Sequence, residues 1–164
     1  VGNGFLIPAG PLREKLSSIK NYDGVFLNGN DEDTSQFKKL INKYSFDIKI
    51  FETYYSPSNI DTFDKSCKYL IFSGIGNPST FQKTLIKHKL QIVKTIEFPD
   101  HYQYTKTDIK KIIQKAKKLN AKILTTEKDY VKITEFDYAE INFLKVDLVI
   151  KEEKELINFL NSRL

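Results

Sequence analysis

The sequence predicts an α/β fold with a mostly parallel sheet and helices on both faces, a three-layer α/β/α arrangement. Short apolar runs alternate along the chain with amphipathic stretches of about ten residues. Such alternation favours βαβ units, in which each helix crosses the sheet to reach the next parallel strand. The chain has 164 residues, of which 40% are hydrophobic, and this is enough for one domain with a real core. We therefore expect residues 1–164 to form a single α/β domain.

The first half of the chain begins with a turn rich in proline and glycine, which is expected to open a helix at Leu12. A buried strand is expected at 23–28, followed by a helix that Thr34 caps. The segment 46–54 alternates apolar and polar side chains, which predicts a strand with one better-buried face. Residues 56–65 are expected to form a surface excursion.

The second half is predicted to contain strands that alternate with helices. The strands are expected at 68–73, 91–98, 121–125 and 143–150, and the helices at 79–87, 105–120 and 152–160. The clearest helix begins at Thr105, where Asp108 completes a pair similar to a capping box. Its apolar residues recur at helical spacing while lysines line the remaining surface, and Asn120 suits the left-handed conformation that ends a helix.

The composition argues against two classes of protein, the disulfide-stabilised secreted scaffold and the membrane-spanning protein. Lys+Arg 26 against Asp+Glu 21 gives a net charge of +5 and a pI near 9.1. That excess either favours anionic partners or reflects solvated lysines on helix faces. The single cysteine, Cys67, cannot form an internal disulfide and is interpreted as a buried or half-buried structural thiol. No apolar run approaches the roughly 18 residues of a membrane span.

Four turns carry the residues that suit chemistry, and the first is the segment 8–14. A Pro/Gly turn that feeds a helix places backbone N–H groups beside Arg13, which favours phosphate binding. Glu14 is suited to hold a hydrated Mg²⁺. The alternative is an ordinary exposed pair in the first turn of a helix.

The second and fourth turns follow the predicted strands at 68–73 and 121–125. Residues 73–78 contain Gly-x-Gly, but Asn77 and Pro78 replace the third glycine of a dinucleotide loop, so a tight strand-to-helix turn is the better interpretation. Residues 125–129 place charged side chains directly after a strand. They either contact a polar ligand or cap the next helix, with Thr126 as the N-cap.

The third turn, residues 98–104, contains Asp100 and His101. An imidazole beside an acid is suited to proton transfer near neutral pH, or to hydrogen bonding with a catalytic carboxylate. The alternative is a loop histidine packed under Tyr102 or Tyr104. The sequence contains neither a Gly-x-x-x-x-Gly-Lys-Ser/Thr loop for a triphosphate nor a Gly-x-Ser-x-Gly hydrolase elbow.

Taken together, the four turns resemble the tetraacyldisaccharide 4′-kinase family, the lipid A 4′-kinases of Gram-negative bacteria. The matching stretches are 2–4, 6–14, 73–78, 98–102 and 125–129. The resemblance implies a two-domain P-loop-type kinase at the cytoplasmic face of the inner membrane. Such an enzyme moves the γ-phosphate of ATP, with Mg²⁺, to the 4′-hydroxyl of a tetraacyldisaccharide 1-phosphate.

The resemblance also implies roles for individual residues. His101 is similar to a histidine that supports a catalytic aspartate acting as base, and Asp100 is grouped with it. Arg13 and Glu14 are similar to the phosphate-side and magnesium-side residues, and Asn77 is placed with them. Three further residues are expected to line or shape the site without a chemical step of their own: Glu127, Lys128 and Asp129.

In one respect the chain departs from the family pattern. The phosphate loop, the catalytic aspartate and the acidic pair for Mg²⁺ are all expected upstream of Val1, in a P-loop domain that this chain lacks. The start at Val1, which runs into Gly2-Asn3-Gly4, also indicates a fragment. We therefore expect a soluble C-terminal part that binds little ATP or Mg²⁺ by itself and has no kinase activity alone.

Two interpretations from other classes remain. One is a stand-alone α/β module that binds nucleotides or other anions without catalysis. The other is a nucleic-acid-binding domain that uses the lysine-rich helix at 105–120. No groove-reading or RNA-stacking signature supports the second, so no nucleic acid is expected among the partners.

Overall fold

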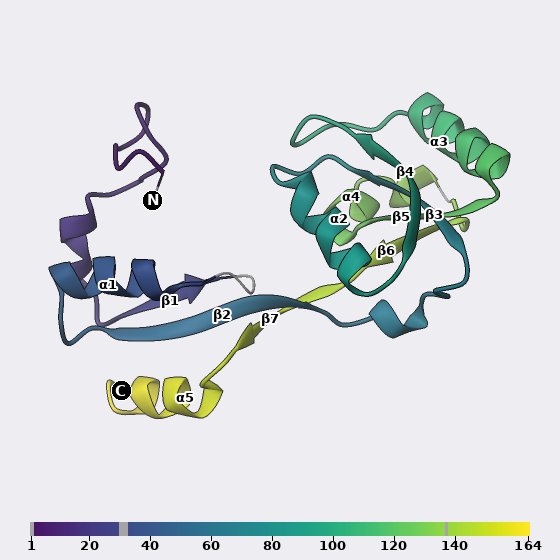
Figure 1. The fold of residues 1–164 in the computed structure, drawn as a ribbon. Coiled ribbons are helices and arrows are strands. Elements are labelled where there is room, and N and C mark those ends of the chain that lie inside the picture. The colour runs from purple at the N-terminus through teal and green to yellow at the C-terminus, as the bar shows by residue number, and fades with distance from the viewer. Residues whose placement is uncertain (1, 30–32, 137) are drawn as a thin grey trace. The chain divides into compact units, whose positions relative to one another are not determined.

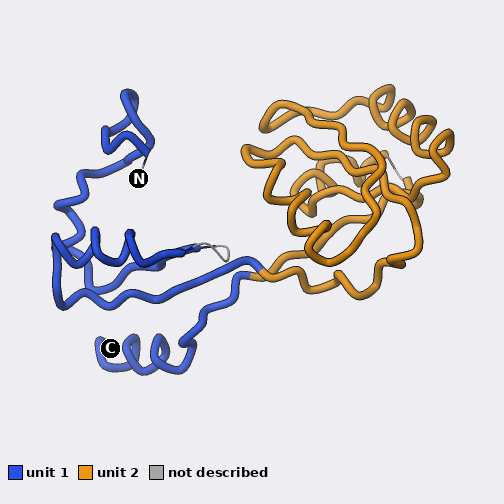
Figure 2. Tube along the Cα trace, in the orientation of Figure 1, with its two compact units in different colours: residues 1–55, 148–164 blue, residues 56–147 orange. Residues whose placement is uncertain are grey.

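The computed structural model describes residues 2–29, 33–136 and 138–164. Contacts divide the chain into two compact units (Figure 2): a first unit of residues 1–55 and 148–164, and a second unit of residues 56–147. The chain passes between them twice, within strand β2 (Lys49–Pro57) and again within strand β7 (Val146–Ile150). That residues 1–164 form a single domain stays a prediction.

The second unit is built on a four-stranded parallel sheet in the order β4-β3-β5-β6 (Figure 1). The strands are β3 (Lys68–Ser73), β4 (Gln91–Glu97), β5 (Ala121–Thr126) and β6 (Ile141–Leu144). The helices are α2 (Pro78–Lys87), α3 (Lys106–Leu119) and the short α4 (Glu127–Val131), with 3₁₀ turns η2 (Ile60–Thr62) and η3 (Thr134–Phe136). Strands β3, β4 and β5 lie within one residue of their predicted positions, whereas β6 begins two residues before the strand predicted at 143–150 and ends at Leu144.

Helices cover both faces of this sheet because the side chains of β3 alternate between them. Leu70 and Phe72 lie in one buried cluster with the apolar residues of α3. Tyr69 and Ile71 lie in another, with Phe81 and Leu85 of α2 among its members. The predicted fold class, a parallel sheet between helical layers, is confirmed.

The predicted ends of α3 are also confirmed. The hydroxyl oxygen of Thr105 accepts a hydrogen bond from the Asp108 N–H at 3.2 Å, and the Asp108 carboxylate accepts one from the Thr105 N–H at 3.0 Å. This reciprocal pair is a capping box, and it satisfies two donors that the first turn leaves free. Asn120 ends the helix with φ 47° and ψ 48°, in the left-handed region that Asn tolerates.

The first unit contains a three-stranded sheet in the order β1-β2-β7, in which β1 (Gly24–Asn28) pairs in parallel with β2. Its helices are η1 (Leu16–Asn21), α1 (Ser35–Tyr44) and α5 (Glu153–Asn161). The helix predicted to open at Leu12 is wrong, since helical structure starts at Leu16 and is of the 3₁₀ type. Thr34 precedes α1 but makes no side-chain cap; the Asp33 carboxylate accepts from the Ser35 N–H instead, at 2.8 Å.

The single strand predicted at 143–150 is also wrong, because the chain changes sheets at Lys145. The Lys145 N–H donates to the side-chain oxygen of Asn59 at 2.8 Å, and the Asn59 amide donates to the Phe143 carbonyl at 2.9 Å. The Lys145 carbonyl accepts from the Ser58 N–H at 3.0 Å. These bonds separate β6, which pairs with β5, from β7, which joins the sheet of β2.

Large apolar side chains are exposed over much of the first unit. Its buried apolar residues include Ile41, Ile48, Phe51 and Leu156. Its exposed ones include Phe5, Ile7, Tyr22, Phe26, Phe37, Tyr44, Phe46, Tyr55, Leu148, Ile157, Leu160 and Leu164. Exposed apolar surface on this scale is typical of a face that another segment or partner covers.

In the first unit, two lysines and one threonine surround the carboxylate of Glu52 on β2. Its carboxylate accepts a hydrogen bond from the Thr34 hydroxyl and lies 3.0 Å from Lys38 Nζ and 3.2 Å from Lys151 Nζ. The hydrogen bond from Thr34, followed by those from the two lysines, lowers the pKa of Glu52 from 4.5 to about 2.

We expect this carboxylate to stabilise the chain above pH 4.5 and to lose that effect as the pH falls towards 2. The unfolded chain takes up the proton near 4.5, before the folded chain does, so protonation favours unfolding in this window. The Glu52→Gln variant is expected to be less stable at pH 7 and to lose less stability between pH 5 and pH 3, as measured by urea unfolding. Glu155→Gln, at an exposed position of α5, is the control. Identical pH profiles for wild type and Glu52→Gln would contradict the prediction.

Candidate functional site

The turns that follow β3, β4 and β5 meet at the carboxyl edge of the second unit's sheet, the edge where parallel sheets usually bind ligands. A Cβ placed on Gly74 would lie 3.0 Å from the Tyr104 hydroxyl and 3.2 Å from the Pro99 carbonyl oxygen. One placed on Gly76 would lie 3.2 Å from the Asp100 carboxylate. The turn after β3 therefore packs directly against the loop after β4, and two glycines make that approach possible.

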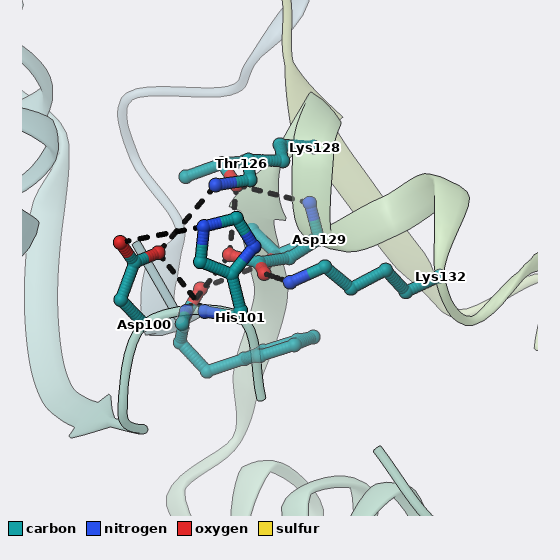
Figure 3. Close-up of polar contacts among 9 residues, drawn as sticks. Asp100, His101, Thr126, Lys128, Asp129 and Lys132 are labelled. Atoms are coloured by element: carbon teal, nitrogen blue, oxygen red, sulfur yellow. Dashed lines mark hydrogen bonds and ion pairs between the residues drawn. The ribbon is translucent and has the colours of Figure 1, made fainter. Parts of the chain in front are cut away.

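Asp129 is the buried centre of this edge, with 0% of the residue exposed (Figure 3). Its Oδ2 accepts hydrogen bonds from the Gly74 N–H and from the Thr126 hydroxyl, both at 2.8 Å. Its Oδ1 lies 3.0 Å from Lys132 Nζ, which supplies the neutralising charge. Asp129 therefore ties the end of β3 to the start of α4.

Tyr104 lies beside this carboxylate in an aromatic cluster. Its ring centroid is 5.5 Å from that of Phe72, 5.1 Å from Phe98 and 5.3 Å from Tyr102. The buried hydroxyl has no hydrogen-bond partner among the described residues. Burial, and then the negative charge of Asp129, raises the pKa of Tyr104 above its ordinary value, so the phenol stays neutral.

Asp100, His101 and Lys128 form an exposed polar group above that buried layer (Figure 3). Asp100 Oδ1 accepts from the His101 N–H at 2.9 Å and lies 3.4 Å from Lys128 Nζ, while Oδ2 lies 3.8 Å from His101 Nε2. Desolvation acts to raise the pKa of Asp100. The His101 N–H bond and the charges of His101 and Lys128 outweigh it, and they hold this pKa below its ordinary value.

His101 presents its imidazole to solvent. Its side chain is 77% exposed, and its backbone has φ 60°, which residues other than glycine seldom adopt. The alternative that His101 packs under Tyr102 or Tyr104 is wrong, since those two rings pack on Phe98. The role of this imidazole in proton transfer stays a prediction.

Of the remaining predicted residues in the second unit, Asn77 and Glu127 lie at helix starts. The Asn77 oxygen caps α2, accepting from the Ser79 hydroxyl at 2.8 Å and the Thr80 N–H at 3.4 Å. Glu127 is exposed, and its carboxylate makes no hydrogen bond or ion pair with the described residues. Thr126 caps α4 by accepting from the Asp129 N–H at 3.2 Å, so the capping interpretation of residues 125–129 is confirmed.

Arg13 and Glu14 belong to the first unit, and both are exposed. The Tyr22 hydroxyl donates to Glu14 at 2.9 Å, and this hydrogen bond raises the pKa of Tyr22. Both residues line an open hollow of about 260 Å³, with Lys15, Leu16, Ser18, Ile19 and Tyr22. The structure thus gathers Asn77, Asp100, His101 and residues 127–129 in one unit, and Arg13 and Glu14 in the other.

Within the described residues, no three His, Cys, Asp or Glu side chains gather as a metal cluster. Glu14 alone offers a single carboxylate, which suits Mg²⁺ only as one ligand beside phosphate oxygens and water.

No helix in the described ranges has both the length and the apolar character needed to cross a bilayer.

Gly74 and Tyr104 belong to turns that the sequence indicated, but their part in the packing of this edge was not predicted, and no role was predicted for Lys132. Gly74 and Tyr104 act through close packing, which no local pattern reveals. Lys132 does carry a signal, since it lies three residues after Asp129, a spacing that places both side chains on one side of a helical turn.

Comparison with known proteins connects the whole chain to one family. The family model described as tetraacyldisaccharide-1-P 4′-kinase matches residues 1–164. The chain is 49% identical over 158 residues to the tetraacyldisaccharide 4′-kinase of Pelagibacter ubique, covering 96% of this chain and 50% of that protein. It is 38% identical over 159 residues to the tetraacyldisaccharide 4′-kinase of Rickettsia typhi, covering 96% and 47%.

Among solved structures, the fold is similar to that of LpxK from Aquifex aeolicus, crystallised in complex with ATP. The TM-score is 0.62 at 24% identity, and the match covers 96% of this chain and 47% of that chain. At this identity the likeness shows the fold alone. The chain spans about half the length of the relatives that it matches.

Proposed function

The chain belongs to the tetraacyldisaccharide-1-P 4′-kinase family, and we propose that it is the C-terminal part of an enzyme with that activity in lipid A biosynthesis. The enzyme would transfer the γ-phosphate of ATP to the 4′-hydroxyl of a tetraacyldisaccharide 1-phosphate. The observation that carries the proposal is the family match over the entire chain.

The reaction needs a base for the acceptor hydroxyl and cations for the transferred phosphate. The bond between the γ-phosphorus and the oxygen of ADP breaks while a bond to the sugar oxygen forms, and the hydroxyl proton leaves to the base. We assign that base to an aspartate outside this chain and assign its support to the imidazole of His101. The exposed His101, with Asp100 and Lys128 beside it, is accessible to such a partner.

The phosphate side of the proposed site involves Arg13 and Glu14 of the first unit. Arg13 offers a guanidinium, which matches phosphate oxygens in a bidentate geometry. Glu14 is suited to hold Mg²⁺ as one ligand among several, and the bound ion would neutralise charge on the phosphates. The side-chain oxygen of Asn77 is occupied in capping α2, whereas its amide N–H₂ group is available to donate a hydrogen bond to a phosphate.

The rest of the active site is assigned to the half of the relatives that this chain does not span. That half would supply the phosphate loop, the catalytic aspartate and the acidic pair for Mg²⁺. The exposed apolar surface of the first unit supports this proposal, because a neighbouring domain would cover side chains such as Phe26 and Phe46.

The proposed substrate also bears on location. An acylated disaccharide stays in a bilayer, so the complete protein would work at the membrane surface, on the cytoplasmic face of the inner membrane where ATP is present. The net charge of +5 suits both an anionic surface and anionic substrates.

A kinase assay on two proteins tests the proposal. The full-length protein is expected to transfer labelled phosphate from ATP to the tetraacyldisaccharide 1-phosphate, and the 164-residue chain alone is expected to show no turnover above the blank. The reason is that positioning and charge stabilisation of the γ-phosphate need the missing phosphate loop.

Each outcome of that assay has a separate meaning. Turnover by the isolated chain at a rate comparable with the full-length protein would disprove the division of the site. No 4′-kinase turnover by the full-length protein would overturn the proposed activity. Tight ATP binding by the isolated chain without turnover would favour the alternative of a stand-alone anion-binding module.

A further inference from the structure

The segment 126–132 makes two separate contacts with its surroundings, one buried and one exposed. From inside, Asp129 accepts the Gly74 N–H, and Gly74 packs against the loop that carries His101. From outside, Lys128 reaches Asp100, the residue next to His101. Neighbouring residues of one short helix therefore reach the same loop by two independent routes.

The inner route is closely packed, since Gly74 and Asp129 are buried and both oxygens of the Asp129 carboxylate have polar partners. Gly74 N–H and Thr126 hydroxyl share Asp129 Oδ2, and Lys132, with only 18% of its side chain exposed, neutralises Oδ1. The contact from Gly74 to the loop is equally close, since a Cβ there would meet Pro99 O, Tyr104 Oη and Tyr102 Cβ at 3.0–3.3 Å. A displacement of Asp129 would therefore move the turn at Gly74 and the 98–104 loop together.

The outer route acts on the exposed end of the same loop. Lys128 Nζ and the His101 N–H both bond Asp100 Oδ1, so the carboxylate sits between the lysine and the histidine backbone. Such a contact matters here because His101 has a left-handed backbone, which its own conformational preference does not maintain. Contacts from other residues must therefore hold the backbone of His101 in this conformation.

We propose that α4 and its cap form a positioning bracket for His101, in which Asp129 holds the loop from beneath through Gly74 and Lys128 holds it from above through Asp100. Asp129 and Lys128 are then positioning residues, and neither needs to touch substrate. For its effect on turnover, the inference rests on the proposed function.

The first test measures the bracket without catalysis, by NMR on the 164-residue chain. In Asp129→Asn the Gly74 amide is expected to exchange with solvent at least about tenfold faster, because the carboxylate charge is lost and a single amide oxygen replaces the two acceptors that Gly74, Thr126 and Lys132 share. In Lys128→Gln, which alters an exposed side chain and leaves the core intact, the amide resonance of His101 is expected to shift. The matched controls are Asp61→Asn and Lys110→Gln, both at exposed positions, which should leave Gly74 and His101 unchanged.

The second test measures turnover in the full-length protein. Lys128→Gln is expected to lower kcat roughly tenfold, with KM for ATP and for the lipid within about twofold, because misplacement of a supporting group affects the chemical step more than binding. Lys128→Arg keeps the cation and should restore most of kcat. Lys110→Gln is again the control.

The outcomes separate the bracket from the proposed function. Unchanged Gly74 exchange in Asp129→Asn together with an unchanged His101 resonance in Lys128→Gln would overturn the bracket, whatever the enzyme does. Shifted resonances with unchanged kcat would overturn the claim that the bracket serves turnover. A full-length protein without kinase activity would refute the proposed function and leave the NMR result to decide the bracket.

Discussion

The His101→Ala variant of the full-length protein is expected to lose about two orders of magnitude or more in kcat. The imidazole is the exposed end of the Asp100–His101–Lys128 group, and the proposed mechanism uses it to support the base that accepts the 4′-hydroxyl proton. Removal of a group that takes part in general-base catalysis costs roughly 10²- to 10⁴-fold. Steady-state kinetics with ATP and tetraacyldisaccharide 1-phosphate measure the loss.

A fall in kcat of this size can be separated from a folding defect. The side chain is 77% exposed, so its truncation removes little packing. Alanine and histidine both carry a Cβ, so the left-handed backbone is unfavourable for either residue and the difference between them is small beside the expected loss in kcat. The variant is therefore expected to unfold at the same urea concentration as the wild type.

His88→Ala provides the matched control. His88 is the other histidine of the chain and follows α2, away from the three turns. Its replacement should leave kcat within about twofold. A rate for His101→Ala equal to that of wild type would remove His101 from the mechanism.

The fold of the second unit could be predicted because its signals are local. Apolar runs bounded by turns predicted the ends of β3, β4 and β5 to within one residue. The pattern from Thr105 to Asn120 predicted α3 together with both of its caps. Alternation of strands and helices then favoured a parallel sheet, and parallel pairing brings the following turns to one edge.

The change of the chain from one sheet to the other was harder to predict, because it depends on long-range pairing. The break between β6 and β7 follows from hydrogen bonds between Asn59 and the segment 143–145, more than eighty residues away. The apolar residues of 143–150 continue on both sides of Lys145 and contain no sign of that break. Similarly, the Thr34 hydroxyl donates a hydrogen bond to Glu52 of β2 and does not make the helix cap that the sequence predicts.

The sequence indicated the turns that meet at this edge of the sheet, but it did not indicate how each of their side chains is held. The charged run 127–129 was expected to line or shape the site as a group, yet its three side chains differ in the structure. Glu127 is exposed without a partner among the described residues, Lys128 reaches Asp100, and Asp129 is buried. Burial of one carboxylate within such a run depends on the turn at Gly74, which lies far away in the sequence. The pairing of Arg13 with His101 across the two units stays a prediction.

The Phe72→Ala variant of the 164-residue chain is expected to lose about 3–5 kcal/mol of unfolding free energy. Phe72 is 0% exposed in the central strand of the sheet, and its ring contacts those of Tyr104 and Phe98 at centroid distances of 5.5 and 6.5 Å. Truncation removes apolar contact and leaves a cavity beneath the 98–104 loop, so both the transfer and the cavity costs apply. Urea unfolding followed by tyrosine fluorescence measures the change, since the chain has no tryptophan.

Phe46→Ala makes the same chemical change at a position that is 85% exposed, and it should alter the unfolding free energy of this chain by less than about 0.5 kcal/mol. The contrast tests whether the core of the second unit lies where the structure places it. Because the cavity would open under the loop that holds His101, the amide resonances of residues 98–104 should also broaden or shift in Phe72→Ala. A cost below about 1 kcal/mol at Phe72 would mean that this ring is not packed as the structure shows.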